Sequence, residues 1–200
     1  MTARTYHHGA LHQAILDAAV QEARRHGPQG VQVRALAKIV GVSPAAFYRH
    51  VPSIDALLAE VAQAAREELG AQLADRREQT FPSRNRKTLA LNRFRAVGRG
   101  YIDFALAEPH LFDTAFTPTM VSPPRPDDPS PWDALTAGIT ELVTAGVVPA
   151  AEADRAALIA WAGVHGIASI LVRQSAVGPL DSNAAIDTVL DGVLRSLETL

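Results

Sequence analysis

The segment from Val33 to Ser53 constrains the fold of this chain more than any other part. It reads VRALAKIVGVSPAAFYRHVPS. The apolar residues at positions 36, 37 and 40 fall on one face of a helix, while Arg34 and Lys38 share the opposite face at a spacing of four. Gly41 follows, and glycine adopts the positive φ that ends a helix in a sharp turn. The pattern therefore predicts one short helix, a tight turn and a second helix.

The residues after the turn define where that second helix begins. Ser43 is a favourable N-cap, and Pro44 is tolerated at the first helical position because its missing N–H has no helical partner there. Ala45 and Ala46 give the first turn only small side chains. A second stop at Val51 and Pro52 precedes Ser53, which is the predicted N-cap of a longer helix.

This arrangement is typical of a helix-turn-helix that reads double-stranded DNA. The small first turn could approach the floor of a groove, and the polar residues one turn later could reach phosphates. Phosphate contacts position a protein on DNA, whereas contacts to base edges specify the sequence. The residues predicted to contact DNA are Arg34, Lys38, Ser43, Pro44, Ala45, Ala46, Tyr48, Arg49, His50 and Ser53.

The distribution of charge agrees with a DNA-binding N-terminus. Residues 1–52 hold six Lys and Arg against two Asp and Glu, a net charge of +4, which leaves −6 for the remainder of a chain whose total is −2. Five of the seven histidines also lie in this segment. A basic segment joined to an acidic remainder is expected when one end of a molecule faces phosphate.

Composition narrows the class of protein further. With 200 residues, 48% apolar and 20% charged, the chain is long enough for one or two folded domains. It has no cysteine, so disulfides, thiolate catalysis and cysteine zinc sites are excluded. We expect no signal peptide, because the N-terminus lacks an apolar core. We also expect no membrane span, because the longest charge-free stretch, 156–172, is too short and its pattern predicts a buried helix. The expected location is the cytoplasm.

The rest of the chain shows helical periodicity and no convincing strand pattern. The predicted fold class is all-α, with about nine helices in two domains: a three-helix helix-turn-helix domain over residues 1–52 and a helical bundle over residues 53–200 for ligand binding and dimerisation. The first helix ends at 26–28. Segment 79–87, which has one proline and clustered charge, is predicted to be a junction, and the Pro-rich segment 117–131 is predicted to be a loop. The further predicted helices are 53–78, 88–108, 110–116, 132–145, 151–173 and 184–197.

The order and spacing of these residues resemble the tetracycline-repressor (TetR) family of bacterial transcription regulators. LAKIVGVSPAAFYRHVPSIDALL is similar to that family's helix 2, turn, recognition helix and start of helix 4, while YHHGALHQAILDAA and WAGVHG resemble segments of one subfamily. The resemblance implies that the segment around Arg4 is an arm that contacts the DNA backbone. Three departures, Gln32, Val51 and Ile54, put capping or phosphate contacts in doubt.

Two other groups of residues could bind a ligand. Trp161 and His165, one turn apart, either belong to the core or line an apolar effector cavity; the candidate set is Phe104, Phe112, Phe116, Trp132, Trp161 and His165. His7, His8 and His12 could be read as a metal cluster, but no nearby carboxylate completes it and Gly9 is expected to interrupt the helix. We predict no metal and no cofactor.

The leading hypothesis is a homodimeric regulator that represses transcription by binding a palindromic operator and is released by a small hydrophobic effector. A dimer is expected because one recognition helix makes too few base contacts, and two-fold symmetry places two of them about 34 to 36 Å apart. The apolar final helix and the glycines at 163 and 166 suggest a four-helix dimer interface. The alternative is a dimeric DNA-binding protein without a small-molecule switch. No catalytic motif is present, so no enzyme activity is predicted.

Overall fold

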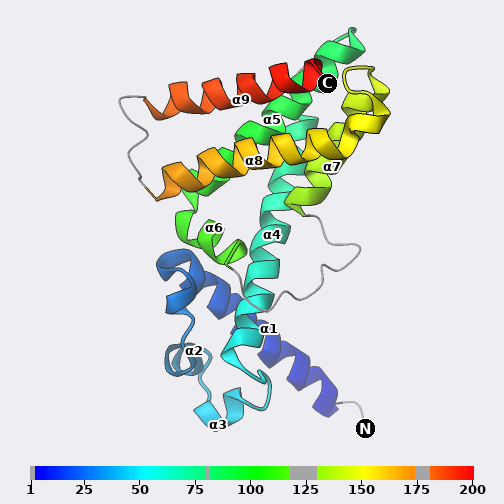
Figure 1. Cartoon of the computed structure of the whole chain (residues 1–200). Coiled ribbons are helices and arrows are strands. Elements are labelled where there is room, and N and C mark those ends of the chain that lie inside the picture. The colour runs from blue at the N-terminus through cyan, green and yellow to red at the C-terminus, as the bar shows by residue number, and fades with distance from the viewer. Residues whose placement is uncertain (1–2, 80–81, 118–129, 174–180) are drawn as a thin grey trace. The chain divides into compact units, whose positions relative to one another are not determined.

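The structure is a computed structural model that describes residues 3–79, 82–117, 130–173 and 181–200, with the side chains of residues 3–8 left out (Figure 1). Within these residues it contains nine α-helices, two 3-10 turns at Pro28–Gly30 and Ala150–Glu152, and no strand, which confirms the predicted fold class. The α-helices are α1 Ala3–His26, α2 Val33–Ile39, α3 Pro44–Phe47, α4 Ile54–Glu78, α5 Arg86–Ala107, α6 Pro109–Ala115, α7 Pro131–Thr144, α8 Ala153–Val172 and α9 Ser182–Glu198.

The helix ends follow the local signals of the sequence. Gly27 and Gly146 have φ values of 71° and 69°, so α1 and α7 end at residues that adopt the left-handed region without a steric penalty. Ser130 caps α7 by accepting a hydrogen bond from the N–H of Asp133 at 3.2 Å. Most of the predicted loop at 117–131 lies outside the described residues, as does part of the predicted junction at 79–87.

One local expectation is wrong. Gly9 does not interrupt the first helix, because α1 runs continuously from Ala3 to His26. A helical glycine costs only about 1 kcal/mol relative to alanine, so a long helix tolerates one that is exposed. The side chains of His7 and His8 lie outside the described residues.

Contacts divide the chain into two compact units. The first comprises residues 1–66 and 108–128, and the second comprises residues 67–107 and 129–200, so the division falls inside α4. The helix-turn-helix therefore shares its compact unit with the start of α4 and with α6. The domain boundary after residue 52 remains a prediction about which parts fold and act independently.

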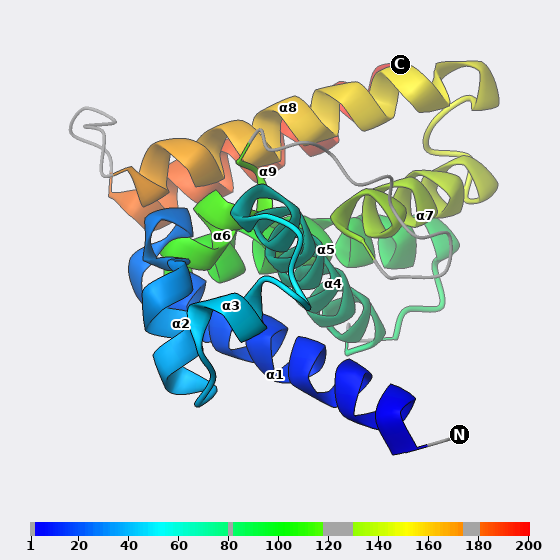
Figure 2. The same cartoon turned by 90° about the horizontal axis from the view of Figure 1, so that it is seen from below.

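In the first unit, α1 packs against α2 and α6, and α2 packs against α3 (Figure 2). An ion pair of 2.7 Å joins Arg24 of α1 to Glu108 at the start of α6. At the other end of α6, the guanidinium of Arg66 donates a hydrogen bond of 2.8 Å to the carbonyl of Ala115. These two contacts attach α6 to α1 and α4 at both of its ends.

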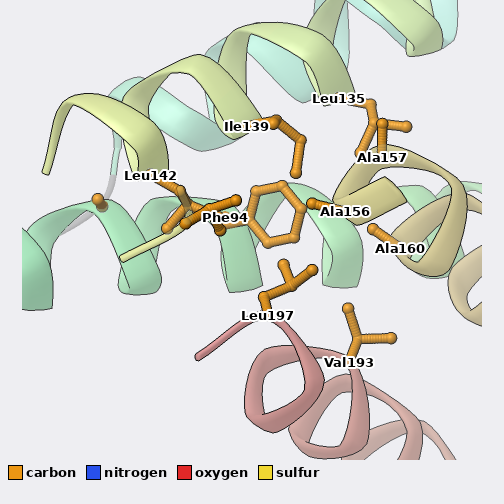
Figure 3. Packing of buried hydrophobic residues seen from close by; sticks show 11 residues of the cluster. Phe94, Leu135, Ile139, Leu142, Ala156, Ala157, Ala160, Val193 and Leu197 are labelled. Atoms are coloured by element: carbon orange, nitrogen blue, oxygen red, sulfur yellow. The ribbon is translucent and has the colours of Figure 1, made fainter. Parts of the chain in front are cut away.

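In the second unit, α5 contacts α7, α8 and α9, while α8 also contacts α7 and α9. Figure 3 shows the centre of the resulting core, where Phe94 of α5 lies among Leu142 and Ile139 of α7, Ala156 of α8 and Leu197 of α9. Leu142, Ala156 and Leu197 are fully buried. Apolar side chains from four helices thus form one continuous core.

The apolar stripe of α9 is used within the chain. Ile186, Leu190, Val193 and Leu197 are buried, and α9 runs alongside α8 (Figure 1). At their contact, a Cβ on Gly163 would lie 2.7 Å from Cγ2 of Val193, so glycine is what allows α8 to approach α9 so closely. Among the described residues, a Cβ on Gly166 would meet nothing within 4 Å. In this part of the chain, Gly163 is therefore packed against another helix and Gly166 is not.

Ion pairs fix the outer surfaces of the second unit. Glu141 of α7 accepts hydrogen bonds from Arg77 of α4 at 2.8 Å and from Arg93 of α5 at 2.7 Å. On the other side of α5, Arg95 pairs with two aspartates of α9, Asp187 and Asp191. Long arginine side chains therefore tie α5 to both α7 and α9.

The segment Ala150–Val172 is long and apolar enough to span a membrane by length and composition, with a mean hydropathy of 1.6. One such helix is weak evidence for a span, because a core helix of a soluble protein passes the same test. Only 33% of its apolar 18-residue window is buried. The expectation of a buried helix is therefore correct for one face of α8 and wrong for the other, where Leu158 and Ile170 are 65% and 41% exposed.

Candidate functional sites

The turn between α2 and α3 has the geometry that its sequence predicts. Gly41 has a φ of 73°, and the N–H of Val42 reaches back to the carbonyl of Ala37 at 2.9 Å. Ser43 then caps α3 by accepting a hydrogen bond from the N–H of Ala46 at 3.2 Å. The cap of α4 also forms, between the hydroxyl of Ser53 and the N–H of Ala56 at 3.0 Å.

The residues predicted to contact DNA form a largely exposed group. Ala46, His50 and Ser53 are half-buried, and the exposed members are Arg34, Lys38, Ser43, Pro44, Ala45, Tyr48 and Arg49. Tyr48 is 52% exposed and its ring lies edge-on to that of Phe47, with centroids 5.9 Å apart. The side chain of Arg4 lies outside the described residues.

The sequence-based prediction did not include Phe47, the buried residue that holds α3 and its exposed side chains against the rest of the first unit. Phe47, the last residue of α3, is fully buried, whereas Ala45 within the helix and Tyr48 directly after it are exposed. Because neighbouring residues on a helix point about 100° apart, burying Phe47 turns the side chains before and after it outward. The sequence contained this signal, since Phe47 is the only large residue without a polar group between Ser43 and His50.

The three departures from the family pattern have visible consequences. Gln32 is the N-cap residue of α2, but its side chain makes no capping bond and instead donates to the carbonyl of Gln29 at 3.1 Å. Val51 is fully buried, so an aliphatic side chain fills that core position. Ile54 is the first residue of α4 and brings no charge to that helix end.

The ring of His12 on α1 makes two contacts within the first unit. Its Nδ1 lies 3.0 Å from the main-chain oxygen of His50, and its Nε2 lies 2.7 Å from a carboxylate oxygen of Glu60. The ring is thus engaged by the segment after α3 and by α4, all within the first unit. His50 and Glu60 are 38 and 48 positions away from His12 in the sequence, so no linear motif reveals that the three residues are in contact.

A second candidate site is a small cavity of about 40 Å³ inside the second unit. Its walls are almost entirely apolar, and Gly98 of α5 lines it at a point where a Cβ would lie 2.9 Å from Cδ2 of Leu190. The lining residues are Leu73, Phe94, Val97, Gly98, Tyr101, Pro131, Leu135, Ala160, Trp161, Val164 and His165. At this size the cavity holds a small group, and a drug-sized ligand would have to widen it.

The cavity has one polar pair. The hydroxyl of Tyr101 lies 2.7 Å from Nδ1 of His165, whose ring stacks on Trp161 with centroids 5.2 Å apart and planes 5° apart. Burial raises the pKa of Tyr101, so its hydroxyl stays protonated. Burial, aided by the positive charge of Arg173, lowers the pKa of His165, which favours a neutral ring. The pair is therefore a neutral hydrogen-bonding group in an apolar wall.

The structure separates the six residues predicted to line an effector cavity. Trp161 and His165 line the cavity, and Trp132 contacts Trp161 with ring centroids 5.7 Å apart. Trp132 also lines an open hollow of about 400 Å³ between α7 and α8. Phe104 is buried without lining the cavity, while Phe112 and Phe116 form a ring pair in the first unit. Tyr101, which the prediction omitted, is the residue that completes the polar pair.

No group of three or more histidine, cysteine, aspartate or glutamate side chains in the described residues is arranged to hold a metal ion. The predicted absence of a metal therefore stays a prediction, because the side chains of His7 and His8 are not described.

Comparison with known protein families agrees with both halves of this arrangement. The family described as "Bacterial regulatory proteins, tetR family" matches residues 15–61, and the one described as "Tetracyclin repressor-like, C-terminal domain" matches residues 94–193. The chain belongs to the TetR family. It is accordingly a DNA-binding transcription regulator, from a family whose members are generally not enzymes. The helix-turn-helix at α2 and α3 is the DNA-binding element of that family.

Individual relatives support the same assignment. The chain is 30% identical over 107 residues to the HTH-type transcriptional regulator YobS of Bacillus subtilis, a match covering 54% of this chain. The match spans about half of that curated relative, 52% of its length.

Solved structures of TetR-like fold align over nearly the whole chain. A protein of unknown function from Rhodococcus sp. RHA1 is 28% identical with a TM-score of 0.74, covering 98% of this chain and 99% of the other. A TetR variant from Acinetobacter baumannii, solved in complex with minocycline, is 19% identical with a TM-score of 0.63, covering 92% and 94%. The second likeness shows the fold alone.

Proposed function

We propose that this TetR-family protein is a dimeric repressor that binds a palindromic operator and releases it when a small, largely hydrophobic effector enters the cavity around Trp161. Its place of action is the cytoplasm, where the DNA is. The observation that carries the effector proposal is the Tyr101–His165 pair, because it supplies one neutral polar anchor in an otherwise apolar cavity.

The DNA side of the proposal rests on the exposed group at α2 and α3. Ala45 is exposed at the start of α3, where a small side chain allows close approach to base edges. Tyr48 and Arg49, exposed beyond the helix, are suited to phosphates. The neighbouring Arg34 and Lys38 add positive charge on the exposed side of α2.

The effector side rests on the contrast between apolar walls and a single polar pair. A ligand that fills such a site gains affinity from burying apolar surface and orientation from one hydrogen bond. Since the cavity holds only about 40 Å³, binding must coincide with a widened form of the second unit. An effector that prefers the widened form shifts the population towards it, which is the linkage that regulation requires.

A thermal-shift screen followed by a release assay tests the effector proposal. Full-length protein is screened against small aromatic and aliphatic compounds with one hydrogen-bonding group, because a ligand that binds the folded state raises Tm by mass action. Hits are then added to the complex with a labelled duplex selected by the protein from its source genome. Each effector is expected to release this duplex.

Two variants separate this cavity from the neighbouring hollow. Tyr101→Phe removes the hydroxyl and keeps the ring, and we expect about tenfold weaker effector binding, the equivalent of one lost hydrogen bond. Thr136→Val alters the open hollow beside Trp132 and should leave effector affinity unchanged. The reverse result, with Thr136→Val weakening binding and Tyr101→Phe neutral, would move the site to the α7–α8 hollow.

The dimer proposal rests on the outward face of α8. Leu158, Ala162, Gly166 and Ile170 recur every four residues. Leu158, Ala162 and Ile170 are exposed, and none of the described side chains lies within 4 Å of a Cβ built on Gly166. An apolar helix face of this kind marks an interaction surface, and a two-fold dimer brings it against its own copy.

Light scattering during size-exclusion chromatography measures the oligomeric state. Leu158→Glu is expected to yield monomers that bind a palindromic duplex more weakly. Leu106→Glu changes another exposed leucine, 42% exposed on α5, and is the matched control. Equal dimer content in wild type and both variants would place the interface elsewhere.

The second candidate function is a DNA-binding regulator whose second unit serves only dimerisation. The small size of the cavity is the observation that favours it. A thermal-shift screen without any hit, together with a duplex complex that no compound dissociates, would support this alternative.

A further inference from the structure

His12 joins three elements of the DNA-binding unit through the two nitrogens of one ring. The ring projects from α1, and its Nδ1 faces the main-chain oxygen of His50 at 3.0 Å. Its Nε2 faces the carboxylate of Glu60 on α4 at 2.7 Å. The side chains of His12 and Glu60 are 34% and 30% exposed, so both are partly shielded from water.

The chemistry of the two partners determines the protonation state of the ring. A main-chain carbonyl and a carboxylate both accept hydrogen bonds, and neither can donate one. A neutral imidazole has one donor nitrogen and one acceptor nitrogen, so it can satisfy only one of these partners. The imidazolium form donates from both nitrogens and satisfies both. With Glu60 ionised, only a protonated His12 satisfies both partners at these distances.

The carbonyl that His12 holds lies at a functionally sensitive place. After α3 ends at Phe47, the N–H groups of Arg49 and His50 bond to the carbonyls of Ala46 and Phe47 at 3.2 and 2.9 Å. This turn carries Tyr48 and Arg49 on the exposed surface. A hydrogen bond to the carbonyl of His50 thus fixes the end of the turn that presents these two side chains.

We propose that His12 is a positioning residue for DNA binding, a proton-dependent latch that fixes the turn after the recognition helix to α4. In the protonated form, the latch holds Tyr48 and Arg49 in the geometry that DNA requires. In the neutral form, the ring releases either the carbonyl of His50 or the carboxylate of Glu60. The proposal rests on DNA binding by the helix-turn-helix and is independent of any effector.

The surroundings of His12 favour the protonated form. The hydrogen bond to Glu60 raises the pKa of His12 above 6.5, burial opposes this, and the carbonyl of His50 and the charge of Glu60 raise it further. Of the groups that face His12, α4 contributes the charged carboxylate of Glu60. The turn after α3 contributes the main-chain carbonyl of His50, a residue whose side chain is also titratable. On α1, the titratable side chain one turn earlier is His8, whose position is not described.

The direction of the pH effect follows from linkage. If DNA binds only the latched form, the DNA-bound protein holds the proton of His12 more tightly than the free protein does. Affinity is then highest below the pKa of the free protein and falls as pH rises through it. The hydrogen bonds of protonated His12 also stabilise the fold, and this contribution depends on pH in the same direction. It is complete below the pKa of His12 in the unfolded chain, about 6.5, and is lost as pH rises through the raised pKa of the folded protein.

Three variants of the full-length protein test the latch. His12→Gln offers a single amide donor group and no titration, His12→Arg keeps donors and charge at every pH, and His26→Gln is the matched control on the same helix. His26 is exposed in the last turn of α1. The probe is a fluorescent duplex enriched by the wild-type protein at pH 6 from a randomised library, and its Kd is measured by anisotropy from pH 6 to 9 at constant salt.

We expect His12→Arg to bind tightly at every pH. From pH 6 to 9, the Kd of wild type and of His26→Gln should rise about tenfold more than the Kd of His12→Arg does. His12→Gln should bind about tenfold more weakly than wild type at pH 6 and converge with it at pH 9. A structural role alone predicts no such convergence. Parallel pH profiles for wild type and His12→Gln would overturn the proposal.

Two further measurements keep the test decisive if His12→Gln does not fold. In the free wild-type protein, the Cε1 proton of His12 should titrate above pH 6.5 by NMR, and an ordinary or lowered value overturns the latch regardless of DNA binding. Glu60→Gln removes the carboxylate, so both this titration and the loss of DNA affinity should move to lower pH. Unchanged curves in Glu60→Gln would also refute the mechanism.

Discussion

The contact between Gly163 and Val193 offers a sharp test of the packing of α8 on α9. Replacing Gly163 by alanine adds a Cβ that would lie 2.7 Å from Cγ2 of Val193 and 3.6 Å from Cγ1 of Val189. Carbon atoms pack comfortably at roughly 3.5–4.0 Å, so the shorter approach requires movement. Val193 cannot easily supply that movement, because it is 7% exposed and its β-branched side chain has few rotamers.

Two opposing effects determine the size of the change. Alanine is favoured over glycine inside a helix by about 1 kcal/mol. Overpacking a core costs about 1–3 kcal/mol, so Gly163→Ala is expected to destabilise the protein by about 1 kcal/mol net. Val193→Ala alone should cost about 2 kcal/mol through lost burial and the resulting cavity.

The double variant isolates the steric contribution. Once Val193 is shortened, the overlap is gone, so Gly163→Ala should stabilise that background by about 1 kcal/mol. The coupling energy between the two positions is then about 2 kcal/mol and favours the double variant. Urea unfolding followed by circular dichroism measures all four proteins at one protein concentration, because dimerisation makes stability concentration-dependent.

A coupling energy below about 0.5 kcal/mol would refute the reasoning, since independent sites add within that range. Stabilisation by Gly163→Ala in the wild-type background would refute it as well. Either result would mean that α8 and α9 lie further apart than the structure places them.

Three other predictions concern the remaining contacts. Glu141→Gln should lower the free energy of unfolding by about 1 kcal/mol at pH 7. Burial opposes ionisation of Glu141, but hydrogen bonds from Arg93 and Arg77 outweigh it and lower its pKa. In urea titrations, the difference in stability from wild type should therefore be complete above pH 4.5 and vanish as pH falls through the lower pKa of the folded protein. Ser43→Ala should cost about 1 kcal/mol through the lost cap of α3, again measured by urea unfolding, and Ser43→Asn should restore most of it. Replacing Tyr48 by phenylalanine should weaken binding to operator and random duplexes alike, whereas Ala45→Leu should weaken operator binding first; equal losses for Ala45→Leu would contradict the placement of the recognition helix.

Local signals in the sequence were sufficient for most of the fold. Gly27, Gly41 and Gly146 mark turns because each adopts a positive φ, and Ser43 and Ser53 cap the helices that follow them. Such features depend on residues within about four positions of one another, which a single sequence displays directly. The same reasoning failed at Gly9, where an exposed helix continues through a glycine that costs it little.

The candidate sites were less accessible to this reasoning because their decisive contacts are long-range. Tyr101 and His165 are 64 positions apart, and His12 reaches partners 38 and 48 positions away. Nothing in the spacing of these residues along the chain predicts the pairing. The six-residue aromatic set failed to form one site for the same reason: Phe112 and Phe116 pack in the first unit, whereas Trp161 lines a cavity in the second.

The final helix, α9, shows what an amphipathic pattern predicts and what it leaves open. A stripe of apolar residues on α9 requires a partner, but the pattern does not identify that partner. In the structure the partners are α5 and α8 of the same chain. Among the described residues, an exposed apolar face lies instead on α8, at Leu158, Ala162 and Ile170. We therefore expect dimerisation through this outward face, and a dimer that survived Leu158→Glu would have to use another surface, because a buried glutamate at its centre would disrupt this one.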